Sequence, residues 1–161
     1  MISEELQKAI DCLQIQDVYL RHCQARCADD FEPKYDDAGE LTFQTRHFVK
    51  ESSMVELNHE KRLLRVFIEL GARWIDERGP EGEEEVKALV EAEFVAEYSM
   101  SGPLEQASVD AFSLQNASYH VWPYWREWLN SQCARMHLPR VVLPAVQLAR
   151  NRDLSGTPEG T

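Results

Sequence analysis

Hydrophobic and polar residues alternate most regularly in two segments in the middle of the chain. From Leu64 to Trp74 an apolar residue occupies every second position, and the segment from Val86 to Met100 repeats the pattern. A period of two over this length predicts two β-strands. The connection 76–85 contains glycine and proline, so we expect the strands to form a hairpin with a solvated, glutamate-rich tip.

Weaker patterns predict the other elements. Residues Ser3 to Gln14 have helical spacing, residues 16–28 and 41–57 favour strands, and 29–40 favours a loop. We expect the second of those strands to be interrupted near 51–53. After Gly102 the period becomes helical and predicts one long helix to about His137, kinked or broken at Pro123. Strands followed by a long helix predict an α+β fold, an antiparallel sheet with the helix on one face.

The length of 161 residues fits a single domain over 1–150. Residues 151–161 are rich in glycine, proline, serine and threonine and predict a flexible tail. Hydrophobic residues make up 43% of the chain, which argues against wholesale disorder.

The net charge of −11 argues against nucleic acid or an anionic membrane as partner, because both need an excess of lysine and arginine. No apolar run approaches the ~20 residues of a membrane-spanning helix. The first five residues are polar and acidic rather than the start of a signal peptide, so we expect a cytoplasmic protein.

Few residues carry recognisable chemistry. The five histidines lie in no known catalytic motif, and the seven glycines form no phosphate-binding loop, so we expect neither an enzyme nor a cofactor. Cys23 and Cys27, beside His22, could hold a metal ion, but on one face of a strand they also pack as small hydrophobic residues. A second group could bind a cation but is more typical of a solvated sheet face: Glu91, Glu93 and Glu97.

An aromatic cluster is the most unusual feature of the sequence. Three of the four tryptophans lie within seven residues, and the cluster comprises Tyr119, Trp122, Tyr124, Trp125 and Trp128. One helix face cannot bury all five, so some of these side chains must meet another subunit or a ligand. We expect Trp74, on the first hairpin strand, to anchor a subunit or helix contact.

The residues from Trp122 to Trp128 resemble a motif of the bacterial export chaperone SecB. They contain the Pro-Tyr-x-Arg-Glu pattern of that family's long helix, and Leu138-Pro139 matches its apolar-proline pair after the helix. The resemblance extends over roughly residues 15–146 and includes the strand order.

This resemblance implies a four-stranded antiparallel sheet, assembly into dimers and tetramers, and binding of non-native polypeptides in apolar grooves without ATP. The family also contacts the translocation motor SecA through acidic residues on its first strand. His22 and Arg26 stand at the matching positions here, which argues against SecA binding through that strand.

We therefore expect a SecB-like holdase for unfolded polypeptides or preproteins, with a role in export. The groove or its lid is predicted to contain Phe43, Phe48, Trp122, Trp125, Leu138, Val141 and Leu143. Sheet core is an equal alternative for Phe43 and Phe48. The other functions that remain open are a dedicated chaperone of one partner, such as an antitoxin, a small metal- or ligand-binding protein or enzyme, and a purely structural oligomer.

Overall fold

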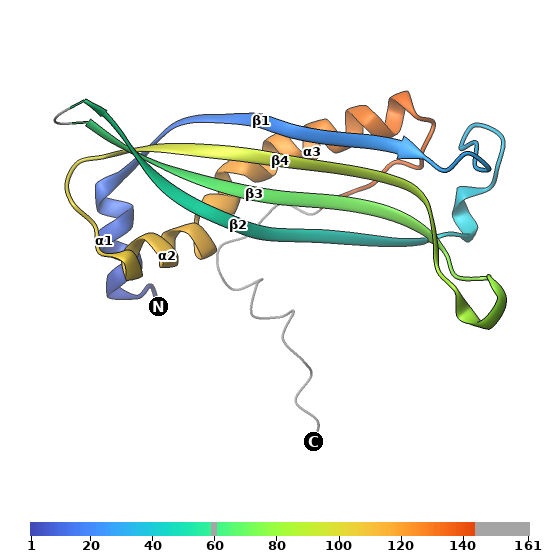
Figure 1. Cartoon of the computed structure of the whole chain (residues 1–161), viewed down its shortest axis with the longest axis horizontal. Coiled ribbons are helices and arrows are strands. Elements are labelled where there is room, and N and C mark those ends of the chain that lie inside the picture. Colours follow the sequence, from blue (N-terminus) through green and yellow to red (C-terminus); the bar gives the residue numbers. More distant parts are fainter. Residues whose placement is uncertain (59–60, 144–161) are drawn as a thin grey trace, which may run out of the picture.

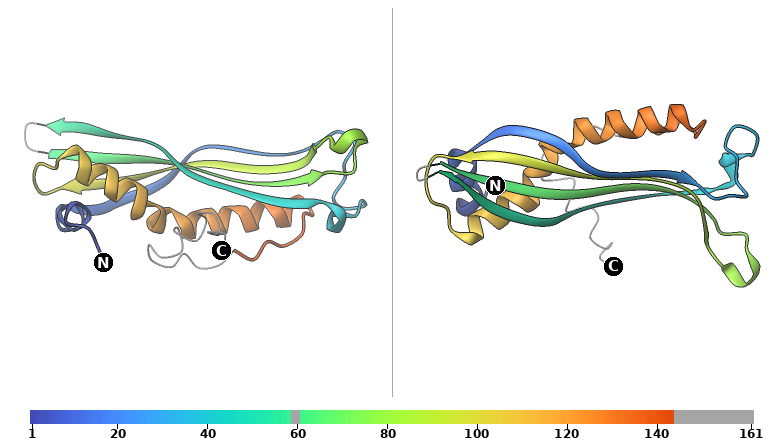
Figure 2. Two further views of the ribbon diagram at one scale, coloured as in Figure 1. Left: turned by 90° about the horizontal axis from the view of Figure 1, so that it is seen from below. Right: turned by 45° about the horizontal axis from the view of Figure 1, so that its top comes forward.

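The computed structural model describes residues 1–58 and 61–143 (Figure 1). Within these residues, four long strands form one antiparallel sheet and the helices lie to one side of it (Figure 2). The elements are α1 (Glu4–Cys12), β1 (Leu13–Cys27), η1 (Ala38–Glu40), β2 (Thr42–Asn58), β3 (Lys61–Asp76), η2 (Pro80–Gly82), β4 (Glu85–Met100), α2 (Gln106–Gln115) and α3 (Ala117–Arg135). This confirms the predicted α+β fold, whereas the predicted tail 151–161 lies outside the described residues.

The strand order β1-β4-β3-β2 places the predicted hairpin, β3 and β4, at the centre of the sheet. Alternate residues of both strands are buried on one face, as period-two spacing requires. They are Leu64, Val66, Ile68, Leu70, Ala72 and Trp74 on β3, and Ala88, Val90, Ala92, Phe94, Ala96 and Tyr98 on β4. We call this side the helix face and the opposite side the outer face.

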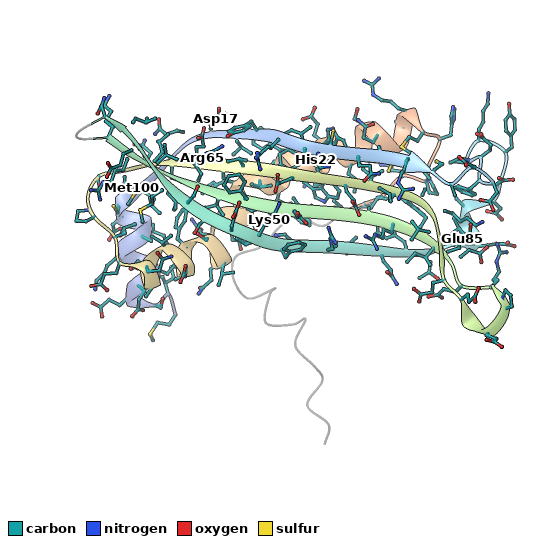
Figure 3. The ribbon with its side chains drawn as sticks, viewed as in Figure 1. Asp17, His22, Lys50, Arg65, Glu85 and Met100 are labelled. Atoms are coloured by element: carbon teal, nitrogen blue, oxygen red, sulfur yellow. The ribbon has the colours of Figure 1, made fainter. Side chains whose placement is uncertain are left out.

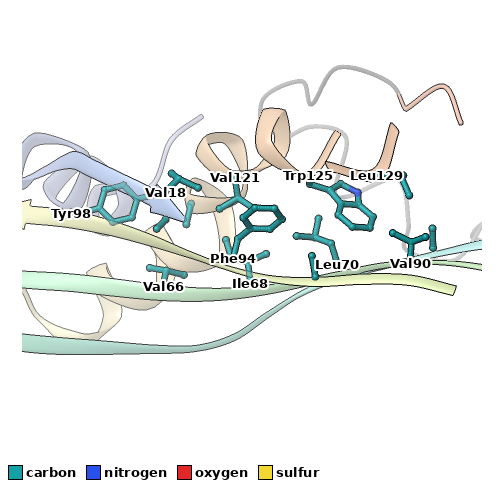
Figure 4. Packing of buried hydrophobic residues seen from close by; sticks show 14 of the residues in the cluster. Val18, Val66, Ile68, Leu70, Val90, Phe94, Tyr98, Val121, Trp125 and Leu129 are labelled. Atoms are coloured by element: carbon teal, nitrogen blue, oxygen red, sulfur yellow. The ribbon is translucent and has the colours of Figure 1, made fainter. Parts of the chain in front are cut away.

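Helix α3 covers the helix face with a row of side chains four residues apart. Val121, Trp125, Leu129 and Cys133 are buried against the sheet, and Figure 4 shows Trp125 above Leu70. A spacing of four keeps these residues on one side of the helix. In the described part of the chain, no helix is long and apolar enough to cross a membrane.

Helices α1 and α2 pack together at one end of the sheet. The Ser3 hydroxyl accepts a hydrogen bond from the Leu6 amide at 3.2 Å and so caps α1. Leu6 and Ala9 are buried, and α1 leads directly into β1.

The predicted single helix is divided at Asn116 rather than at Pro123. Asn116 has φ −121° and ψ −36°, and its amide closes α2 on the Phe112 carbonyl at 2.8 Å. Pro123 lies inside α3 on its exposed side, so its ring does not disturb the packing of α3 on the sheet. Proline therefore remains in the helix without ending it.

Strand β2 is continuous where we expected an interruption. Its register against β3 shifts between Val49 and Glu51, which leaves Lys50 as the extra residue of a bulge. The strand then continues to Asn58. The predicted irregularity is present, but it bends the strand instead of dividing it.

Candidate client-binding surface

The edge strand β2 extends the helix face beyond the part that α3 covers. Phe43, His47 and Val49 lie opposite Trp74, Leu70 and Ile68 of β3, which are buried in the core. Residues paired across neighbouring strands share a face. These β2 side chains therefore point to the side of the helices, yet Phe43 remains 39% exposed.

Aromatic contacts join this strip of β2 to the core and to α3. The Phe43 ring lies 5.2 Å from the Trp74 ring, and the His47 ring lies 5.8 Å from the Trp122 ring, as centroid distances. His47 Nε2 is also 2.7 Å from the hydroxyl of Ser118, a buried residue of α3. Together these contacts make a partly covered aromatic strip from Phe43 to Trp122, which we call the aromatic strip.

The chain reverses after α3 and returns along the helices' side of the sheet (Figure 2). The Leu138 amide donates to the Cys133 carbonyl at 3.0 Å, and His137 adopts a positive φ of 56° at the reversal. Leu138 is buried in the core. Val141 and Leu143 are half-buried and pack against the same core, so this segment supplies further apolar surface on the helix face.

The predicted groove residues fall into three groups. Phe43, Trp122, Val141 and Leu143 are partly accessible on the helix face. Trp125 and Leu138 are core residues, and the 2% exposure of Trp125 leaves no surface for a client. Phe48 lies opposite Glu69 on the outer face, under the guanidinium of Arg46. One groove therefore cannot contain both Phe43 and Phe48, because an odd number of positions separates them along a strand.

His47 is the residue of this surface that we did not predict. Alternation from Phe43 places it on the helix face, so the sequence contained the signal. Its contact with Ser118 depends on how α3 crosses the sheet, which no local pattern determines.

A histidine–tyrosine pair lies beneath the surface where α3 meets β4. The Tyr98 hydroxyl is 2.8 Å from His120 Nδ1. Burial lowers the pKa of His120 below its usual 6.5 and raises the pKa of Tyr98 above its usual 10. His120 is therefore neutral at pH 7, and its Nδ1 shares a hydrogen bond with the Tyr98 hydroxyl. Burial therefore keeps both the imidazole and the phenol in their uncharged forms, which suits a structural contact inside the protein.

The outer face differs from the solvated glutamate face that we expected. Glu91 and Glu97 pair with Arg73 and Arg65 at 3.1 and 3.2 Å. The Glu93 side chain is only 7% exposed and contacts Lys50 at 3.0 Å and Arg21 at 3.3 Å. The carboxylates are thus engaged by arginine and lysine from neighbouring strands, and the prediction of a solvated row was wrong at Glu93.

His22 and Arg26 are exposed on β1, opposite Glu93 and Leu89 of β4, and so lie on the outer face. Cys23 is exposed and Cys27 half-buried, both as free thiols. Among residues 1–58 and 61–143, no group of three or more histidine, cysteine, aspartate or glutamate side chains is arranged to hold a metal ion.

Comparison with known proteins identifies the fold. No protein-family model matches the chain, and no curated protein matches it. Among solved structures, the chain is similar to the Mycobacterium tuberculosis Rv1957 SecB-like chaperone in complex with a ChAD peptide from the HigA1 antitoxin. The similarity covers 90% of this chain and 98% of that chain, with a TM-score of 0.63 and 17% sequence identity. This chain has the SecB-like fold.

Proposed function

We propose that the protein is a chaperone that binds extended, non-native polypeptide segments on the helix face of its SecB-like sheet. The observation that carries this proposal is the aromatic strip, where Phe43, His47 and Trp122 remain partly accessible beside an edge strand. Apolar side chains in such a strip can cover the exposed apolar residues of a client, and binding slows aggregation by mass action.

The backbone of β2 adds a second means of recognition. Among residues 1–58 and 61–143, only one side of β2 pairs with another strand, since β2 stands at the end of the strand order. An extended client can hydrogen-bond to such an edge whatever its sequence, while alternate side chains enter the strip. The combination suits a protein that binds many unfolded chains.

The direct test is aggregation suppression with a matched pair of variants. A chemically unfolded, unrelated protein is diluted into increasing amounts of the chaperone without nucleotide, and light scattering is followed. Phe43→Ala is compared with Phe48→Ala, because the two phenylalanines are 39% and 40% exposed on opposite faces of one strand.

The proposal predicts suppression by the natural protein, weaker suppression by Phe43→Ala and unchanged suppression by Phe48→Ala. Equal loss in both variants would place the binding surface elsewhere. Absence of suppression by the natural protein would remove the general chaperone function.

We also propose that the chain assembles as a homodimer or homotetramer. Both β1 and β2 are edge strands, and Ile15 and Leu20 of β1 remain 39% and 38% exposed. Exposed edges with apolar side chains are commonly covered by another chain. Sedimentation equilibrium would give the mass of the assembly, and a monomer at micromolar concentration would contradict this part of the proposal.

A dedicated chaperone for one partner is the second candidate. It is favoured by the structural neighbour, which is bound to an antitoxin peptide, and by His22 and Arg26 at the positions where the SecB family has acidic residues for SecA. An export role would need that motor contact. Binding of one partner at least tenfold tighter than a panel of unrelated unfolded chains would favour the dedicated role.

A further inference from the structure

The outer face of the sheet is layered by charge. Its carboxylates lie close to the backbone, while its guanidinium and ammonium groups lie above them and meet solvent. Glu93 is 7% exposed, whereas its partners Arg21 and Lys50 are 53% and 45% exposed. The pair of Glu69 and Arg46 has the same order, with 24% and 47%. A molecule approaching this face therefore meets cations first.

A further guanidinium, with a histidine near it, adds to this outer layer. Arg26 and His22 are exposed on β1, and the described residues supply no acidic partner for either side chain. Figure 3 shows this face, with α3 behind the sheet and with His22 and Lys50 labelled. The exposed acids of the face, Asp17 and Glu51, stand on the two edge strands and leave the region between Arg26 and Lys50 cationic at its surface.

The negative charge of the chain is concentrated elsewhere. Residues 29–40 and 76–85 contain twelve acidic and two basic residues, and so account for nearly all of the net charge of −11. These two segments lie together at one end of the sheet (Figure 1). The part of the outer face between Arg26 and Lys50 is therefore a locally cationic region on a strongly acidic protein.

A shallow hollow lies in the middle of the cationic region. Gly71 of β3 has no side chain and stands between Arg46 of β2 and Glu91 of β4. A Cβ at this position would be 3.4 Å from Glu91 Cγ. The hollow beside it has a volume of about 230 Å³ and is bordered by His22, Arg46 and Lys50 together with the paired glutamates Glu69, Glu91 and Glu93. This is enough room for the side chain of an aspartate or glutamate from a partner.

We propose that the outer face docks a polypeptide segment rich in aspartate and glutamate, presented by a partner protein. Its carboxylates would contact Arg26 and His22, and would share the half-exposed guanidinium of Arg46 with Glu69. The acidic end of the sheet repels a long polyanion that extends past this face, which favours a short acidic segment over nucleic acid. The proposal is independent of client binding, because it uses the opposite face of the sheet.

Fluorescence anisotropy with a labelled ten-glutamate peptide tests this proposal. A ten-lysine peptide and a ten-nucleotide single strand of DNA serve as comparison probes, each at low and high salt. The variant is Arg26→Glu, and the matched control is Arg126→Glu, an exposed arginine on α3 with the same change of charge. Circular dichroism confirms that both variants are folded.

The proposal predicts that the glutamate peptide binds more tightly than the other two probes and that salt weakens binding. Arg26→Glu should weaken binding about fivefold, the size of one exposed ion pair, and Arg126→Glu less than twofold. Equal effects of the two variants, or preference for the lysine peptide, would overturn the proposal. Tighter binding of DNA would assign the face to nucleic acid, and a smaller assembly of Arg26→Glu in sedimentation would assign it to a second copy of this chain. Either result would also overturn the proposal.

Discussion

The two faces of the sheet are made by alternate residues of the same strands, yet they are stabilised differently. On the helix face, Ile68, Leu70 and Phe94 pack under α3 in a continuous apolar layer. On the outer face, Glu69 and Glu93 of the same strands are held by arginine and lysine. Burial of apolar side chains stabilises the helix face, and ion pairs with hydrogen bonds hold the side chains of the outer face.

Alternate residues of a strand point to opposite faces of the sheet, so a residue's position along the strand decides whether it packs under the helices or lies on the charged outer face. Phe43 and Phe48 are chemically identical and equally exposed on β2, but one meets Trp74 and the other meets Arg46. The helix face therefore presents apolar side chains, and the outer face presents charged ones.

The largest loss of stability is expected from a truncation on the helix face. Trp125→Ala removes a ring that is 2% exposed and leaves a cavity between α3 and the sheet, so the free energy of unfolding should fall by about 3–5 kcal/mol. Urea denaturation followed by circular dichroism measures it. Trp128→Ala, at the half-buried ring stacked on Trp125, should cost less. Equal losses would mean that α3 packs differently on the sheet.

A smaller loss is expected from the outer face. Glu93→Gln leaves Arg21 and Lys50 without their shared carboxylate, but both cations are about half exposed and can turn to water. The free energy of unfolding should therefore fall by only about 1–2 kcal/mol. Glu56→Gln, which removes the exposed pair with Arg62, should cost less than about 0.5 kcal/mol. If the two variants were equally stable, burial of Glu93 would contribute nothing.

The smallest effect is a pH dependence that arises on the helix face. Burial lowers the pKa of His120 in the folded protein, while the unfolded chain takes up a proton near pH 6.5. The stability contribution of neutral His120 is therefore complete above pH 6.5 and declines as the pH falls below that value. Denaturation midpoints between pH 7.5 and 5 should fall less steeply for His120→Gln than for the natural protein. The control is His22→Gln on the outer face, and equal slopes for all three proteins would show that His120 does not couple to folding.

The sequence predicted the elements with the strongest periodicity. The hairpin of β3 and β4 follows from alternation alone, because both strands are central and one face of each is buried. The edge strand β2 alternates less clearly because neither face is fully covered, and its bulge at Lys50 was therefore expected to be a break. The division of the final helix at Asn116 depends on the path of α2 and α3 around the end of the sheet, which local sequence does not encode.

The candidate site was predictable only in part. Phe43 and Phe48 are an odd number of positions apart, so strand alternation alone places them on opposite faces. The burial of Trp125 follows from its four-residue spacing with Val121 and Leu129. The burial of Glu93 was not predictable, because its partners Arg21 and Lys50 come from two different edge strands, 72 and 43 residues away in the chain. Long-range pairing of this kind appears only when the sheet order is known.

The most direct test of the account is site-specific photocrosslinking on β2. A benzophenone amino acid replaces Phe43 in one protein and Phe48 in another, and each is irradiated in the presence of a labelled unfolded client. We expect a strong crosslink from position 43 and little or none from position 48, because client binding is proposed for the helix face alone. A crosslink from position 48 that equals or exceeds that from position 43 would contradict the account.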